Sequence, residues 1–154
     1  MSEPAVLKEP HSIIGKMAVP YRTFVGAVAS KFFIELRDSK KIMGVRCPQC
    51  NLVYMPPRLV CGKCFSKLDE WVELDGKGTL LTYTVVNYKE PTQPPDVNPP
   101  FIYGIVQLDG ADTGLPHLIG GVKPEEVSVG MRVQAEFKDK REGSILDIKY
   151  FKPL

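Results

Sequence analysis

Four cysteines in two closely spaced pairs are the residues of this chain best suited to chemistry. Cys47-Pro48-Gln49-Cys50 is followed, after ten residues, by Cys61-Gly62-Lys63-Cys64, and the chain has no other cysteine. Each C-x-x-C turn presents two thiolates, and two such turns close a tetrahedron around Zn²⁺ with Zn–S distances of about 2.3 Å. The pattern predicts a zinc ribbon whose metal ligands are Cys47, Cys50, Cys61 and Cys64.

Other uses of the four thiols fit the spacing less well. Disulfides are disfavoured in a reducing cytoplasm, and a thioredoxin-type redox motif does not come in duplicate within about thirty residues. A rubredoxin-like iron site or a [4Fe–4S] cluster remains open as the alternative. Four thiolates fill the coordination sphere of zinc, whereas a catalytic zinc keeps a position for water, so the expected role is structural.

The remaining residues form no recognisable catalytic constellation. The two histidines lie in a Pro-flanked N-terminal stretch, at His11, and in a strand-like run, at His117. A nucleophilic Ser or Cys needs a base that a third group holds beside it, and neither histidine falls in such a setting. A glycine-rich phosphate loop is also missing from the sequence. We therefore expect no catalytic residue and no bond-making by this chain itself.

The elements that position the cysteines can be predicted from the surrounding pattern. A helix is expected from Ser30 to Ser39, with apolar residues on one face, and the zinc ribbon is expected over residues 42–70. Five β-strands should follow, over residues 79–88, 101–108, 117–122, 131–138 and 144–151. Strands this short, with one helical turn among them, favour a closed five-stranded OB-fold barrel over a small open sandwich.

The expected fold class is therefore mainly β, in three parts. An N-terminal arm and its helix cover residues 1–41, the rubredoxin-like zinc ribbon covers 42–70, and the OB-fold covers 71–154. Five prolines within residues 90–100 predict polyproline-II geometry between the first two barrel strands. This loop is either a stiff connector or a preformed ledge for a partner.

Composition and charge exclude several classes of protein. The 154 residues are 44% hydrophobic and 25% charged, as in a globular protein, and no apolar run approaches the roughly 20 residues of a membrane span. The N-terminus lacks the pattern of a secretory signal, so we expect a cytoplasmic protein. Residues 1–46 carry eight basic and four acidic residues, which is either scatter or a basic arm that meets an acidic partner or a phosphate-bearing ligand.

The order of these features resembles the zinc-ribbon/OB-fold proteins that accompany thiolases and related acyl-CoA condensing enzymes. The resemblance covers about residues 30–154, and the segments that carry it are SKFFIELRD (30–38), KIMGVRCPQC (41–50), PPR (56–58), WVELDGKGT (71–79), YTVV (83–86), PFIYG (100–104), GMRV (130–133) and FKP (151–153). The family often has Gly after the second cysteine of each pair, where φ is positive, but this chain has Asn51 and Phe65 there. The longer arm is similar to that of the small subunits of heteromeric thiolases such as benzoylsuccinyl-CoA thiolase.

The resemblance implies an accessory subunit without catalytic residues. The reactive cysteine would belong to a separate thiolase-fold chain, on which this protein would dock through residues 1–41 and the Pro-rich loop, and it would help to bind or channel acyl-CoA. The candidate contacts with acyl-CoA or with the partner are Phe32, Phe33, Arg58, Tyr83, Phe101 and Tyr103.

A nucleic-acid-binding module is the competing function, because zinc ribbons and OB-folds both serve in that role. Aromatic side chains such as Tyr83 and Tyr103 are of the kind on which bases stack. However, residues 47–154 carry twelve basic against fourteen acidic residues, and a protein that binds phosphates should be basic there.

Overall fold

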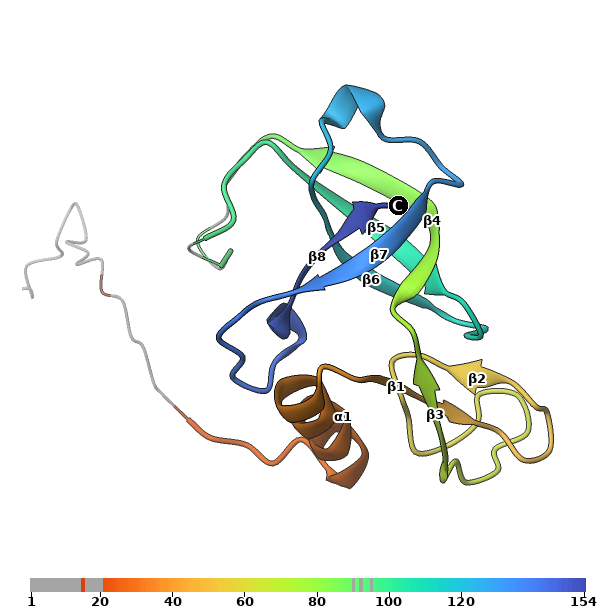
Figure 1. The fold of residues 1–154 in the computed structure, drawn as a ribbon. Coiled ribbons are helices and arrows are strands. Elements are labelled where there is room, and N and C mark those ends of the chain that lie inside the picture. Colours follow the sequence, from red (N-terminus) through yellow and green to blue (C-terminus); the bar gives the residue numbers. More distant parts are fainter. Residues whose placement is uncertain (1–14, 16–20, 90, 92, 95) are drawn as a thin grey trace, which may run out of the picture.

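The structure, a computed structural model, describes residue 15 and residues 21–89, 91, 93, 94 and 96–154. Most of the predicted arm before residue 21, including His11, lies outside the described residues. Figure 1 shows a β-barrel above one helix and a small sheet. No helix among the described residues has the length and apolar character to span a membrane.

The helix α1 (Ala27–Ser39) begins three residues before the predicted start at Ser30. Gly26 occupies the N-cap position and its carbonyl accepts a hydrogen bond of 2.9 Å from the N–H of Ser30, so Ser30 already lies in the first turn. Ala27 and Ala29 favour helix, which accounts for the earlier start. Phe32 and Leu36 face the interior and are buried.

The predicted zinc ribbon contains a three-stranded antiparallel sheet. Its strands are β1 (Ile42–Arg46), β2 (Val53–Tyr54) and β3 (Glu70–Leu74), in the order β2-β1-β3. The two cysteine turns follow β1 and precede β3 in the chain. Apart from two of the cysteines, the buried residues of the ribbon's own core are Val45, Tyr54 and Leu68. A core this small leaves much of the ribbon's stability to a bound metal.

Five strands close into a barrel, which confirms the predicted OB-fold architecture and shows that the open sandwich was wrong. They are β4 (Lys77–Val86), β5 (Phe101–Leu108), β6 (Gly114–Ile119), β7 (Arg132–Phe137) and β8 (Ile148–Pro153), in the order β4-β5-β6-β8-β7. The β6–β8 pair is parallel and the other pairs are antiparallel. Two short 3₁₀ turns, Pro124–Glu126 and Ile145–Asp147, lie in the connections.

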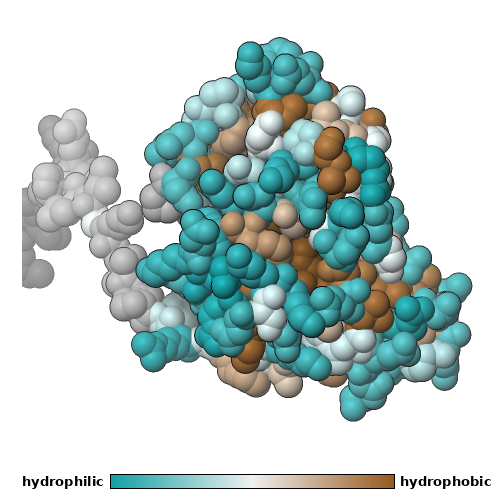
Figure 2. Space-filling model, viewed as in Figure 1, coloured by the Kyte–Doolittle hydropathy of each residue, from teal (hydrophilic) through white to brown (hydrophobic). Residues whose placement is uncertain are grey.

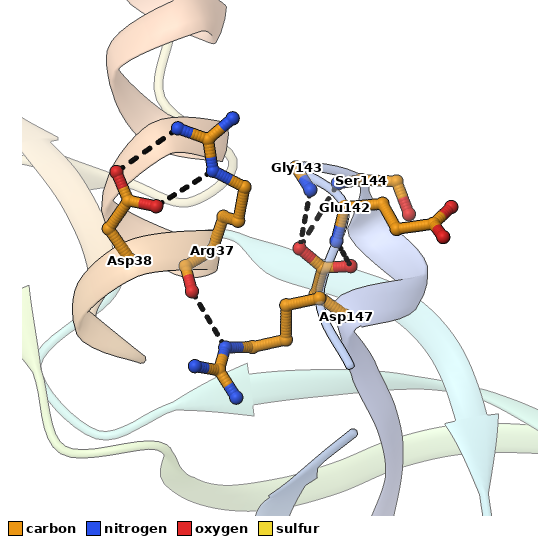
Figure 3. Close-up of polar contacts among 7 residues, drawn as sticks. Arg37, Asp38, Glu142, Gly143, Ser144 and Asp147 are labelled. Atoms are coloured by element: carbon orange, nitrogen blue, oxygen red, sulfur yellow. Dashed lines mark hydrogen bonds and ion pairs between the residues drawn. The ribbon is translucent and has the colours of Figure 1, made fainter. Parts of the chain in front are cut away.

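The segment 144–147 forms the second of these turns rather than the start of the last strand. The buried carboxylate of Asp147 accepts backbone hydrogen bonds from Glu142, Gly143 and Ser144 at 2.9, 2.8 and 3.3 Å (Figure 3). These bonds satisfy the buried charge and hold the chain in a tight loop, so that β8 starts only at Ile148. The alternation of apolar residues predicted a strand here, and it carries no signal of the hydrogen bonds that form the loop instead.

The same loop fastens the helix to the barrel. The Nε atom of Arg141 donates a hydrogen bond of 2.7 Å to the carbonyl oxygen of Arg37 in α1 (Figure 3). Beneath this contact, one continuous buried cluster includes Leu36 of the helix, Ile42 of the ribbon and Phe151 of the barrel. Figure 2 shows apolar atoms along the boundary between the barrel and the elements below it. The three parts therefore share one core.

Candidate functional site

The four cysteine side chains converge as a metal site requires. Their Sγ atoms all lie within 4.8 Å of one another, and those of Cys47 and Cys64 are 3.5 Å apart. In a tetrahedral site with Zn–S distances of about 2.3 Å, the sulfurs stand about 3.8 Å apart. The residues present therefore fit a zinc ion held by four thiolates, with no position left for a water molecule.

The two cysteine turns have the same backbone geometry. The N–H of Asn51 donates to the carbonyl of Cys47 at 2.9 Å, and the N–H of Phe65 donates to the carbonyl of Cys61 at 3.1 Å. Each first cysteine in turn donates its own N–H to the residue five positions later, Leu52 or Ser66, at 2.8 and 2.9 Å. The duplicated motif thus folds as two equivalent knuckles.

Asn51 and Phe65 adopt the left-handed conformation that the family pattern led us to expect after each knuckle. Their φ angles are 58° and 60°. This conformation costs an L-residue about 1–2 kcal/mol, although Asn tolerates it better than most. The side chain of Asn51 accepts a hydrogen bond of 2.9 Å from Arg46. The second knuckle closes in spite of the bulky Phe65.

Hydroxyl groups lie within hydrogen-bond distance of the two cysteines of the second knuckle. The Tyr54 hydroxyl lies 3.2 Å from the Sγ atom of Cys61 and accepts a hydrogen bond of 3.2 Å from the N–H of Gly62. Because that N–H occupies the oxygen as acceptor, the hydroxyl proton is free to point at the sulfur. The hydroxyl of Ser66 lies 3.2 Å from the Sγ atom of Cys64. Both contacts stabilise thiolates.

These contacts shift the pKa values of three of the four thiols in different directions. The hydrogen bond from Tyr54 lowers the pKa of Cys61 to about 6, and the hydrogen bond from Ser66 lowers the pKa of Cys64. The pKa of Cys50 is raised to about 12, chiefly by its hydrogen bond with Cys64. A metal that binds all four thiolates must therefore displace a proton held at Cys50, and its affinity rises with pH.

His117 is the one histidine among the described residues, and it lies in the interior. His117 is 3% exposed; its Nε2 atom lies 3.1 Å from the carbonyl oxygen of Ile145, and its Nδ1 atom is buried without a hydrogen-bond partner. The ring of Phe151 packs edge-on against it. Burial lowers the pKa of His117, so it is a neutral core residue rather than an accessible base.

A cavity of about 610 Å³ opens beside the loop that joins β4 and β5. Its lining is mainly aliphatic and aromatic and consists of Val86, Tyr88, Gln93, Pro94, Val97, Phe101, Tyr103, Leu118 and Leu146. An adjoining hollow of about 260 Å³ shares Phe101 and Leu118 with it and adds the cationic side chains of Lys138 and Lys149. Apolar walls with a few polar groups at the edge are typical of small-molecule sites.

Of the six residues predicted to contact acyl-CoA or a partner, only Phe101 and Tyr103 meet at this cavity. Phe33 lies in a groove between α1 and residues 142–145, and Arg58 stacks on the ring of Tyr54 at 4.7 Å. The other two make contacts within the chain. Phe32 is 2% exposed, and the hydroxyl of Tyr83 donates to the carbonyl of Val127 at 2.9 Å.

Two residues of the site were missed in the sequence. Ser66, two positions after Cys64, is close enough in the chain to have been suspected as a partner of the thiolate. Tyr54 precedes Cys61 by seven residues and reaches it only because β2 folds back beneath the second knuckle. Nothing in the local pattern indicates that contact.

Comparisons with known proteins agree with this architecture. Residues 35–70 match the family described as "ChsH2, rubredoxin-like zinc ribbon domain", and residues 71–138 match "ChsH2, C-terminal OB-fold domain". A DUF35 domain-containing scaffold protein of Methanocaldococcus jannaschii is 35% identical over 126 residues, which are 77% of this chain and 86% of that protein. This chain belongs to the DUF35 family. The predicted family of zinc-ribbon/OB-fold proteins is thereby confirmed.

Further members support the DUF35 assignment. A DUF35 domain-containing scaffold protein of Pyrococcus furiosus is 30% identical over 129 residues, which are 81% of this chain and 92% of that protein. Among solved structures, an Ltp2-ChsH2(DUF35) aldolase has a chain that superposes with a TM-score of 0.66 at 24% identity, covering 86% of this chain and 98% of that one. A DUF35 protein of unknown function from Sulfolobus solfataricus gives a TM-score of 0.62 at 21% identity, covering 84% and 87%. These two likenesses concern the DUF35 fold.

Proposed function

We propose that this protein is a non-catalytic subunit of a thiolase-type acyl-CoA acyltransferase complex in the cytoplasm. It docks on a thiolase-fold chain, which carries the reactive cysteine, and it helps to bind or channel acyl-CoA. The observation that carries this proposal is an open, mainly apolar cavity at Phe101 and Tyr103. The benzoylsuccinyl-CoA thiolases are one class of complex that fits the description.

The chemistry of the cavity supports an acyl thioester as ligand. Acyl-CoA combines an apolar or aromatic acyl group with a phosphate-bearing nucleotide. The cavity offers aromatic and aliphatic walls, with Tyr103 44% exposed, and the adjoining hollow offers Lys138 and Lys149. Lys138 already pairs with Asp96 at 2.9 Å, so Lys149 is the cation more readily available to a phosphate.

The surface before α1 supports a protein partner. Tyr21 and Phe24 expose most of their rings, and Val25 and Ile34, which line one groove, are exposed as well. Large exposed apolar patches are rare on monomeric soluble proteins, and where they occur they often mark a contact surface. The related proteins point the same way, since two are described as scaffold proteins and one belongs to a pair of proteins, Ltp2 and ChsH2.

Purification of the natively expressed protein at physiological salt tests the partner. We expect a thiolase-fold chain to co-elute at fixed stoichiometry and to be identified by mass spectrometry. If the protein elutes alone, or with nucleic acid, the proposal is wrong.

Calorimetric titration of the purified complex with CoA and with an acyl-CoA tests the ligand. Phe101→Ala and Tyr103→Ala should each weaken acyl-CoA binding about tenfold, because each removes an aromatic wall of the cavity. Val129→Ala removes an exposed apolar side chain that does not line the cavity, and should leave the affinity unchanged. Equal affinities for all four proteins would refute the assignment of the cavity.

A further inference from the structure

The second zinc knuckle exposes Phe65 in a conformation that aromatic residues avoid. Its φ angle is 60° and its side chain is 79% exposed. The other described residues with positive φ are six glycines, Lys40 after α1, and Asn51 at the matching place of the first knuckle, so Phe65 is the one aromatic residue among them. Bulky residues in this conformation are outliers, and such outliers cluster at functional sites.

No ring or cation contact among the described residues stabilises Phe65 in this position. Phe65 stacks on no other described ring and no described cation lies over its face. A glycine would close the same turn, with its Phe65 N–H to Cys61 carbonyl hydrogen bond, without strain and without an exposed ring. The described residues therefore do not account for an aromatic side chain at this position.

The hairpin that carries Phe65 exposes other apolar side chains as well. The hairpin that carries it is held by a bridge between Val60 and Lys67, and both Leu59 and Val60 are exposed on the same hairpin. Leu59 in turn lines a groove of about 400 Å³ against Val25 and Ala29 at the start of α1. Exposed apolar side chains thus lie both on the hairpin of the second knuckle and at the start of α1.

The charges around Phe65 favour a protein over a phosphate-rich partner. Residues 42–70 carry four basic and two acidic residues, and a Zn²⁺ ion with four thiolates adds a formal charge of −2, so the ribbon is neutral. Arg46 pairs with Glu70 at 3.1 Å and Lys67 lies 3.9 Å from Asp69. The other two cations of the ribbon have no carboxylate partner among the described residues: Arg58, which lies over the ring of Tyr54, and Lys63. Nucleic acids and anionic membranes need several uncompensated cations.

We propose that Phe65 is the anchor by which the zinc knuckle docks on a partner protein, inserting its ring into an apolar pocket that has a carboxylate at its edge for Lys63. This inference rests on the proposed function, in which the partner is the thiolase-fold chain. A metal bound by the four cysteines would hold the turn rigid, so that an aromatic anchor on it would lose little conformational entropy on binding. Buried aromatic anchors of this kind dominate the affinity of many interfaces.

Two substitutions separate the ring from the backbone strain. Phe65→Ala removes the ring but keeps a β-carbon at positive φ, whereas Phe65→Gly removes both. We expect both variants to keep their zinc and to bind the purified thiolase-fold chain at least about tenfold more weakly. Only Phe65→Gly should raise the melting temperature, by about 2–4 °C. Val129→Ala, an exposed apolar change on the barrel, should alter neither quantity.

The outcomes distinguish this inference from the proposed function. If the wild-type chain forms no complex with the thiolase-fold chain, the proposed function fails and the anchor fails with it. If the wild-type chain binds and both Phe65 variants bind equally tightly, only the anchor is wrong. Binding that depends on Phe65 to single-stranded RNA, or to vesicles of equal parts phosphatidylserine and phosphatidylcholine, would also overturn it.

Discussion

Asp112, on the loop between β5 and β6, exchanges a pair of hydrogen bonds with Val53 of β2. The N–H of Val53 donates to the Asp112 carboxylate at 2.7 Å, and the N–H of Asp112 donates to the Val53 carbonyl at 2.8 Å. Thr113 adds a second pair, since its hydroxyl accepts from the N–H of Met55 and donates to the Met55 carbonyl, both at 2.8 Å. The barrel therefore covers the edge of the ribbon sheet, and disturbance of one part should reach the other.

Asp112→Ala should lower the free energy of unfolding by about 1–3 kcal/mol, because it leaves the N–H of Val53 without its acceptor in a partly buried place. Urea denaturation of the zinc-loaded protein measures this. Asp109→Ala serves as the control, since Asp109 forms an exposed pair with Arg132 and its loss should cost no more than about 1 kcal/mol. Equal costs for the two variants would show that the Asp112 contact does not join the ribbon to the barrel.

Tyr54→Phe should weaken zinc binding about tenfold, since hydrogen bonds to the ligands of a metal commonly contribute 10- to 100-fold in affinity. The substitution removes the hydroxyl that donates to Cys61 and leaves the ring beneath Arg58 in place. Competition with a chromogenic chelator measures the affinity. Tyr83→Phe removes a hydroxyl in the barrel, and it should leave zinc affinity unaltered. A Tyr54→Phe protein that holds zinc as tightly as the wild type would contradict this account of the second knuckle.

The stability of the barrel should depend on pH through His117. Burial lowers the pKa of His117 below its ordinary value of 6.5 in the folded chain. The unfolded chain therefore takes up the proton at higher pH, so that stability is fully present above about pH 6.5 and declines as pH falls toward the folded pKa. His117→Gln should flatten this decline between pH 6.5 and 5 in urea denaturation. The account of His117 fails if the variant keeps the slope of the wild type.

Cys61→Ser should abolish zinc binding and unfold the ribbon. A structural zinc supplies on the order of 10 kcal/mol of apparent binding free energy, which the few buried side chains of the ribbon cannot replace. Elemental analysis should give one zinc per wild-type chain and none for the variant. Stoichiometric iron with a visible charge-transfer band would contradict the zinc assignment. A Cys61→Ser complex that assembles and binds CoA normally but reacts slowly would instead indicate a catalytic metal.

The architecture could be predicted largely because strong local patterns agreed with the fold. The duplicated C-x-x-C motif and the alternation around Val133 lead directly to a ribbon and a barrel strand. The departures arise where local polar contacts overrule periodicity. Ser144 and Asp147 turn the chain before β8, and with Gly26 as its N-cap α1 begins before Ser30, its predicted start.

The candidate site was less predictable because it depends on contacts between distant segments. Phe101 and Tyr103 meet at the cavity because they lie two positions apart on one strand and therefore share a face, which the sequence does show. Phe32 was a reasonable surface candidate on an arm without an evident core, but the barrel provides that core and buries it. The contact of Tyr54 with Cys61 requires the folded hairpin and has no sequence signature.

The central claim is that this chain assists acyl transfer while another chain performs it. Intact-mass spectrometry of the native complex, denatured after brief incubation with an acyl-CoA, tests this directly. We predict that the acyl group appears on the thiolase-fold chain in one copy, while the mass of this chain stays that of the unmodified polypeptide. An acyl adduct on this chain, formed at the rate of turnover, would contradict the claim.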